Sequence, residues 1–387
     1  MTLMSSPGTA ASLRAANQVR VVHALRQHQE LSQADIARDT GLAPATVSSI
    51  VKDLVAAGLL TTTGGAGRRG ATVAISRRAG LVGGVDFGHS HVQVSLGDLG
   101  GRVLVTAQEP LDNDHAHEDG LALAHRMLDR LLAAEADAGS LHAVGIGLPA
   151  PLGADGVIDS GSILPGWIGV HAADAAEKEF GVPTRADNDA NLGALAEHAL
   201  GAGRGTSSMA YLKLSSGVGC GLVLDGRVYR GGIGTAGELG HMTMDETGPL
   251  CRCGSRGCLE AYVGGSALTT QFAPIRAQLS VREFVALANN GDTGAQRLIE
   301  DAGRYLGRAA AALANVLGPE LLVIGGDLSD AGAPLIDGVR DGLRRHALAP
   351  VAAQVRVERA ALGARSSSIG SVLYALEGLS LTGAARA

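Results

Sequence analysis

Apolar residues recur at helical spacing in the first part of the chain, and polar residues fill the positions between them. A first helix follows Leu13, where Val19, Val22 and Leu25 recur at helical spacing and Val21 lies beside them. A second helix is predicted from residue 33 to about residue 39. It begins after Ser32, because Ser32 and Asp35 have the spacing of a capping box in which Asp replaces the usual Glu.

A third helix is predicted from Pro44, because Gly41 ends the second helix and proline suits a first helical turn. One of its faces would pack against the other helices through Val47, Ile50, Val51 and Leu54. The opposite side holds small residues and a lysine, which let a helix approach base edges in the major groove. The residues predicted to contact DNA from this helix are Ala45, Thr46, Ser48, Ser49 and Lys52.

A hairpin is predicted over residues 59–75, after Gly58 stops the third helix. Its glycine-rich tip at 64–70 carries Arg68 and Arg69, which can reach phosphate or the minor groove. An ordinary solvated face is the alternative for the third helix. The order of three helices and a hairpin nevertheless favours a winged helix-turn-helix DNA-binding domain, with its linker, over residues 1–80.

Short apolar strands alternate with helices in the remaining chain, residues 81–387. The predicted strands lie at 81–88, 92–96, 102–105, 143–148, 210–214, 221–224 and 321–324, and the predicted helices lie near 120–138, 190–199 and 295–317. Such alternation indicates a layered α/β fold. Strand-rich starts near Leu81 and Ala210 suggest two related lobes.

Composition and charge narrow the class of protein. A chain of 387 residues exceeds one ordinary core, and no stretch approaches the ~20 apolar residues of a membrane span. The N-terminal residues lack the pattern of a secretory signal, so the predicted location is the cytoplasm. The net charge of −6 is unevenly placed, because residues 1–78 carry +5 and the remainder carries −11. This asymmetry favours the N-terminal part as the DNA contact.

A histidine and three of the four cysteines cluster in the sequence as His241-x9-Cys251-x-Cys253-x4-Cys258. Thiolate and imidazole are the ligands that tetrahedral Zn²⁺ prefers. Disulfides explain the cluster poorly, because three cysteines cannot all pair and nothing indicates export. Four protein ligands would close the coordination shell, so the predicted zinc is structural. Cys220 is predicted to be a packed residue outside this site.

Several motifs together resemble the ROK family, whose name covers repressors, unassigned reading frames and sugar kinases. The most specific is Gly237-Glu238-Leu239-Gly240-His241 with the segment 251–260, and the segments 187–191, 217–219, 325–326 and 362–364 follow in the family's order. The resemblance implies an actin-like ATPase (ribonuclease H-like) fold of two lobes with a sugar cleft between them. Members with an N-terminal winged helix-turn-helix are typically repressors of carbohydrate genes, and free-standing members are kinases.

The resemblance also implies a set of sugar-binding residues: Asn188, Asp189, Glu238, His241 and Glu260. Carboxylates and an amide suit vicinal hydroxyls, because they offer paired acceptors and donors. In a kinase, Asp189 would also take the proton from the attacking hydroxyl. His241 would bind zinc through one ring nitrogen and turn the other toward the sugar.

The implied nucleotide site departs from the family pattern. Its candidate residues are Asp86, Gly88, Ser216, Gly217, Gly219, Gly325 and Gly326. Kinases of the family have Asp-x-Gly-Gly-Thr in the first phosphate turn, where this chain has Asp86-Phe87-Gly88-His89-Ser90. We expect His89 to add a side chain where phosphate would approach, and to strain a turn that needs positive φ. An asparagine that the family places before Trp167 is also missing, and the sequence argues against ATP as a cofactor.

Two hypotheses follow for the function. The first is a transcription regulator, a repressor of carbohydrate genes, that binds double-stranded operator DNA as a homodimer or homotetramer. A sugar or sugar-phosphate effector would change lobe closure and act through the connection at residues 61–80. The second is an ATP-dependent sugar kinase of the glucokinase type that carries a DNA-binding module. Asp189 supports the second hypothesis, whereas His89 and the missing asparagine oppose it.

Overall fold

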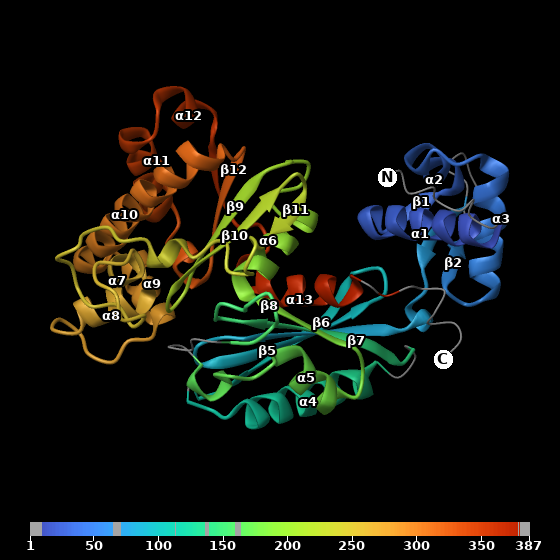
Figure 1. Ribbon diagram of the computed structural model, residues 1–387, viewed down its shortest axis with the longest axis horizontal. Coiled ribbons are helices and arrows are strands. Elements are labelled where there is room, and N and C mark those ends of the chain that lie inside the picture. Colours follow the sequence, from blue (N-terminus) through green and yellow to red (C-terminus); the bar gives the residue numbers. More distant parts are fainter. Residues whose placement is uncertain are drawn as a thin grey trace, which may run out of the picture.

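The computed structural model describes residues 10–64, 71–112, 114–135, 139–158, 164–377 and 379. An N-terminal domain of helices and a small sheet lies at one end of the molecule, beside two larger lobes that are each built on a five-stranded sheet (Figure 1). Within these residues, none of the helices combines the length and apolar character needed to cross a bilayer.

The N-terminal domain has the predicted order of elements: α1 (Ala10–His28), α2 (Gln33–Thr40), α3 (Pro44–Ala56), β2 (Leu60–Thr63) and β3 (Thr72–Ile75). The capping box of Ser32 and Asp35 begins α2, and Gly41 ends it in the left-handed region at φ 64°. A further strand, β1 (Glu30–Ser32), was not predicted. It pairs with β3, so the sheet has the order β1-β3-β2.

The first lobe is a mixed sheet in the order β6-β5-β4-β7-β8. Its strands are β4 (Leu81–Phe87), β5 (His91–Asp98), β6 (Val103–Pro110), β7 (Leu141–Leu148) and β8 (Thr184–Asn188). The first three strands are antiparallel, and β7 and β8 run parallel to β4. Helices α4 (His117–Ala134) and α5 (Ala172–Phe180) cover one face of this sheet and enclose a core that includes Trp167 (Figure 1).

The second lobe repeats this plan in the order β11-β10-β9-β12-β13. Its strands are β9 (Met209–Leu214), β10 (Val218–Leu224), β11 (Arg227–Tyr229), β12 (Leu321–Gly325) and β13 (Arg356–Arg359). Its helices are α7 (Glu260–Val263), α8 (Gly265–Phe272), α9 (Val281–Asn289), α10 (Thr293–Leu317), α11 (Ala333–His346) and α12 (Ala349–Gln354). When the strands of each sheet are numbered by their order in the chain, both sheets have the order third, second, first, fourth, fifth. This shared order confirms the prediction of two related lobes.

Two helices lie between the sheets, α6 (Asp189–Leu200) and α13 (Ser366–Leu376) (Figure 1). Helix α13 packs backbone to backbone with its neighbours. A Cβ added to Gly145 of β7 would lie 2.1 Å from the Ser371 carbonyl oxygen, and one added to Gly370 would lie 1.9 Å from the Leu192 carbonyl oxygen of α6. Because the contact leaves no room for a side chain, α13 cannot move without moving α6 or the sheet.

The N-terminal domain shares an apolar core with the first lobe. Val21 and Leu25 of α1 belong to the same buried cluster as Leu99 and Leu376. Across this junction, Arg26 Nε donates to the Leu99 carbonyl at 3.0 Å, and Arg26 Nη1 donates to the Leu376 carbonyl at 3.4 Å. The last turn of α13 therefore contacts the N-terminal domain directly.

Candidate functional site

A cleft of about 1110 Å³ lies where the two lobes meet. Most of the candidate ligand-binding residues line it: Asp86, Gly88, Asn188, Asp189, Ser216, Gly217, Gly219, Glu238, His241, Glu260 and Gly326. Gly326 adopts φ 80°, which favours glycine at this turn. Gly325 lies behind the cleft wall, because its Cβ position is 2.4 Å from the Tyr211 hydroxyl oxygen.

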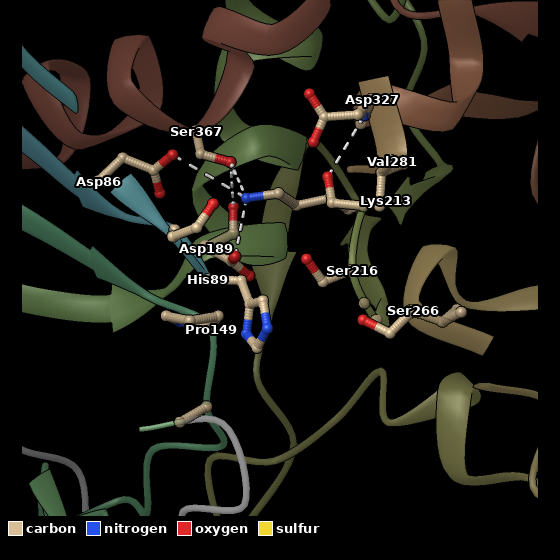
Figure 2. A pocket seen from close by; sticks show the side chains of 18 of the residues that line it. Asp86, His89, Pro149, Asp189, Lys213, Ser216, Ser266, Val281, Asp327 and Ser367 are labelled. Carbon is tan, nitrogen blue, oxygen red and sulfur yellow. Dashed lines mark hydrogen bonds and ion pairs between the residues drawn. The ribbon is translucent and has the colours of Figure 1, made fainter. Parts of the chain in front are cut away.

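A lysine stands between two buried carboxylates in the cleft (Figure 2). Lys213 Nζ donates to Asp189 Oδ2 at 2.7 Å and to Ser367 Oγ at 3.0 Å, and it lies 4.0 Å from Asp86 Oδ2. Burial raises the pKa of Asp86 to about 6. Burial alone would lower the pKa of Lys213, but Asp189 and Asp86 outweigh it, so the pKa is raised and the ammonium stays charged.

The turn that the family resemblance compares with a phosphate turn is closed by the Gly88 N–H, which donates to the His91 carbonyl at 2.8 Å. The prediction of backbone strain at His89 is wrong. In the described part of the chain, the non-glycine residues with positive φ are Gln29, Asp225 and Gln278, so the turn closes without that conformation. The side chain of His89 does line the cleft, and the His91 ring lies 2.4 Å from the Cβ position of Gly88. Burial lowers the pKa of both histidines, which favours neutral rings.

Two of the implied sugar-binding groups are already oriented by the backbone. Asn188 caps α6, since its Oδ1 accepts the Ala190 N–H at 2.9 Å, and its Nδ2 donates to the Ala150 carbonyl at 3.2 Å. Glu260 accepts the Val218 N–H at 3.0 Å and lies 3.2 Å from the Arg252 guanidinium. These contacts fix both side chains before any ligand binds.

Glu238 is the acid at the rim of this group. Burial, with Asp189 and Glu260 nearby, raises the pKa of Glu238 to about 7. Its Oε2 lies 3.9 Å from His241 Nε2. The implied sugar-binding set therefore offers three carboxyl groups, an amide and an imidazole to the cleft, and these groups can accept hydrogen bonds from several hydroxyls and donate to them.

The predicted metal ligands converge. One ligand atom from each of His241, Cys251, Cys253 and Cys258 lies within 4.8 Å of the other three. Cys253 Sγ and Cys258 Sγ are 3.7 Å apart, and Cys251 Sγ is 3.8 Å from His241 Nδ1. A tetrahedral zinc with Zn–S bonds of ~2.3 Å has ligand–ligand edges of about 3.8 Å, so the donors fit this ion. Cys220 is buried on β10 and does not belong to the cluster.

The side chains of Ala45, Ser48, Ser49 and Lys52 are exposed on α3, and Thr46 is half-buried. The apolar face of the same helix is buried, as predicted. Arg14 of α1 borders the exposed face: it donates to Ser49 Oγ at 3.4 Å and pairs with Asp53. The predicted wing contacts Arg68 and Arg69 lie outside the described residues.

Sequence reasoning missed Lys213, Ser367 and Arg14. A signal existed for the first, since Lys213 is a lone charge in the apolar strand Met209–Leu214. Ser367 and Arg14 come from segments far from their partners in the chain, and no local pattern marks them.

Two repeated α/β lobes around a polar cleft, joined to a winged helix at the N-terminus, define the class of protein. The ROK family model matches residues 82–377, and the MarR family model matches residues 14–69. The chain belongs to the ROK family, because this match covers more than half of it.

Relatives that match this chain over more than nine-tenths of its length include proteins named as repressors. The xylose repressor of Bacillus spizizenii is 26% identical over 373 residues, which cover 93% of this chain and 95% of that protein. The crystal structure of a ROK family transcriptional regulator, a homologue of the E. coli MLC protein, has 25% identity and a TM-score of 0.78, and covers 96% of this chain and 100% of its own. A ROK family glucokinase from Streptomyces griseus, in complex with glucose and AMPPNP, has 26% identity and a TM-score of 0.66, and covers 77% of this chain and all of its own.

Proposed function

We propose that the protein is a DNA-binding transcription regulator, a repressor of carbohydrate genes, controlled by a sugar or sugar phosphate in the cleft. One observation carries this proposal: the domain with the exposed α3 face is packed onto the first lobe, which forms one side of the cleft, through a shared core and Arg26. The repressor names of full-length relatives support the same function. The domains proposed for these roles are residues 1–80 and 81–387.

On DNA, we assign base contacts to α3 and phosphate contacts to the wing. Exposed Ala45, Ser48 and Lys52 can enter a major groove, while Arg14 can reach the backbone beside Ser49. Arg68 and Arg69 would contact phosphate or the minor groove. A homodimer or homotetramer would place two such helices on the half-sites of a pseudo-palindromic operator.

In the cleft, sugar hydroxyls would be bound by Asn188, Asp189, Glu238, His241 and Glu260. The structural zinc, one per chain, would hold His241 through Nδ1, which leaves Nε2 beside Glu238 for the ligand. Loss of zinc would therefore loosen one side of the sugar site. We place the protein in the cytoplasm, where its DNA target and the metabolites lie.

The two functions would be coupled by α13. At its first turn, Ser367 Oγ donates to the Asp189 carbonyl at 2.9 Å and accepts from Lys213, and at its last turn the Leu376 carbonyl accepts from Arg26. Its 11 residues span about 16 Å at 1.5 Å per residue. Because α13 is close-packed on both sides, a ligand that moves Asp189 would shift the N-terminal domain. We propose this route beside the connection expected at residues 61–80.

A sugar kinase is the second candidate, favoured by Asp189 in the cleft and by the similar glucokinase from S. griseus. His89 in the phosphate turn and the pairing of Asp189 with Lys213 oppose it. A coupled assay with Mg·ATP and common hexoses should show turnover well below about 1 s⁻¹, the low end of typical enzymes.

Selection of bound fragments from a random DNA pool tests the proposed function. The full-length protein should enrich a pseudo-palindromic sequence, and a thermal-shift screen should find a sugar or sugar phosphate that raises its melting temperature. The same sugar should change the yield of selected DNA. Failure to enrich any sequence, together with sugar turnover above about 1 s⁻¹, would favour the kinase instead.

A further inference from the structure

Lys213 is the cationic centre of the cleft. The lysines of this chain are Lys52, Lys178 and Lys213; the first two are exposed, while the side chain of Lys213 is 15% exposed at the end of β9. Figure 2 shows its ammonium pointing between Asp86 and Asp189. An ammonium has three donors, and here Asp189, Ser367 and the more distant Asp86 surround it.

Without a lysine, the two acids would form an oxygen-rich pair suited to a divalent cation. Carboxylates from two elements of a cleft are typical ligands of Mg²⁺ and Mn²⁺, and phosphoryl transfer from ATP needs such an ion to neutralise phosphate charge. Asp86 is 4% exposed, and its Oδ1 has no hydrogen-bond partner among the described residues. Because this buried oxygen has no partner, the Asp86 carboxylate has a binding position that Lys213 does not fill.

We propose that Lys213 is a built-in counter-ion of Asp86 and Asp189, and that it prevents a divalent metal from binding between them. The cleft then binds the uncharged polyol portion of a ligand and does not bind a magnesium–nucleotide complex. Asp189 is then a hydroxyl acceptor and not a general base, because its Oδ2 accepts the ammonium hydrogen bond at 2.7 Å. Two of the three Lys213 donors are bonded to Asp189 and Ser367, and Asp86 lies 4.0 Å from the ammonium, so these protein oxygens compete with any phosphate for Lys213. This inference rests on the proposed regulator function and names the ligand chemistry of its cleft.

The test compares wild type with Lys213→Met, which keeps the side chain length and removes the charge. Lys178→Met is the matched control, because it makes the same change at an exposed lysine outside the cleft. Mn²⁺ binding is counted by electron paramagnetic resonance on zinc-loaded, full-length protein. Lys213→Met should bind one Mn²⁺ per chain more than wild type and Lys178→Met, and the added ion should be lost in Lys213→Met/Asp86→Asn.

Lys213→Met leaves two carboxylates facing each other, which can impair folding. Thermal unfolding of this variant is therefore also measured with and without Mn²⁺. A melting temperature that rises with Mn²⁺ supports the proposal. A protein that stays unfolded in Mn²⁺, or that folds and binds no added ion, overturns it. So does a wild-type protein that binds Mn²⁺ at a site abolished by Asp86→Asn. If wild type selects an operator and responds to sugar while these tests fail, this inference alone is wrong; if it selects no operator, the proposed function fails independently.

Discussion

Replacement of Arg26 by methionine tests the contact between the two domains. Arg26→Met keeps an unbranched side chain in the shared core and removes the donors to the Leu99 and Leu376 carbonyls. The junction would then be held by apolar packing alone. We expect the N-terminal domain and the last turn of α13 to open more often.

The size of the effect follows from the geometry. A charged donor at 3.0 Å contributes about 1.5–3 kcal/mol, and the bond at 3.4 Å contributes less. Against this, burial lowers the pKa of Arg26, and its Nη2 is buried without a partner among the described residues, which costs about 1 kcal/mol. The net loss is therefore about 1–2 kcal/mol, or a factor of about 5–30 in the opening equilibrium.

Hydrogen exchange of the backbone amides measures this opening. Amides of α1 to β3, of residues 98–103 and of residues 371–377 should exchange about 5–30-fold faster in Arg26→Met than in wild type. Arg20→Met is the control, because Arg20 lies on the same helix but bonds to the Thr40 carbonyl within the N-terminal domain. If Arg26→Met leaves residues 371–377 as protected as Arg20→Met does, the domains are not joined through Arg26.

Three further outcomes are expected. Metal analysis should find about one zinc per chain, and Cys253→Ser should lose both the metal and the sugar-dependent thermal shift; a zinc-free wild type that still responds contradicts this. Because the folded pKa of Asp86 is raised to about 6, the unfolding free energy should fall as pH rises from about 4 to 6. Asp86→Asn should show a smaller fall than wild type when denaturation is measured across that range, and the part due to the raised pKa of Glu238 should remain. Lys213, Asp189 and Asp327, which face Asp86, are the same in both proteins. The Arg68→Ala/Arg69→Ala double variant should bind all DNA more weakly with a smaller salt dependence, whereas an unchanged salt slope would place the wing away from DNA.

The parts that sequence predicted well are those set by local pattern. The capping box of Ser32 and Asp35, the stop at Gly41 and the buried face of α3 all depend on neighbours within a few residues, and the structure has each of them. The metal ligands were also found, because a short loop carries Cys251, Cys253 and Cys258.

The parts that were missed depend on contacts between distant segments. Helix α13 begins with three serines and contains Gly370, a polar and weakly helical start. It is helical because those serines bond to Glu197, Asp189, Lys213 and Gln93, and because Gly370 fits against α6. Similarly, the prediction of strain at His89 assumed a positive φ, and the backbone conformation of this turn depends on the folded structure around it.

The central claim, that the cleft controls DNA binding, is tested most directly by operator affinity with and without the sugar that stabilises the protein. For wild type, saturating sugar should change the dissociation constant of the selected operator about 5–150-fold, the usual range of allosteric coupling. Glu238→Gln should keep the sugar-free affinity and lose most of this change, while Glu246→Gln, outside the cleft, should keep both. A sugar that raises the melting temperature of wild type but leaves operator affinity unchanged would contradict the account.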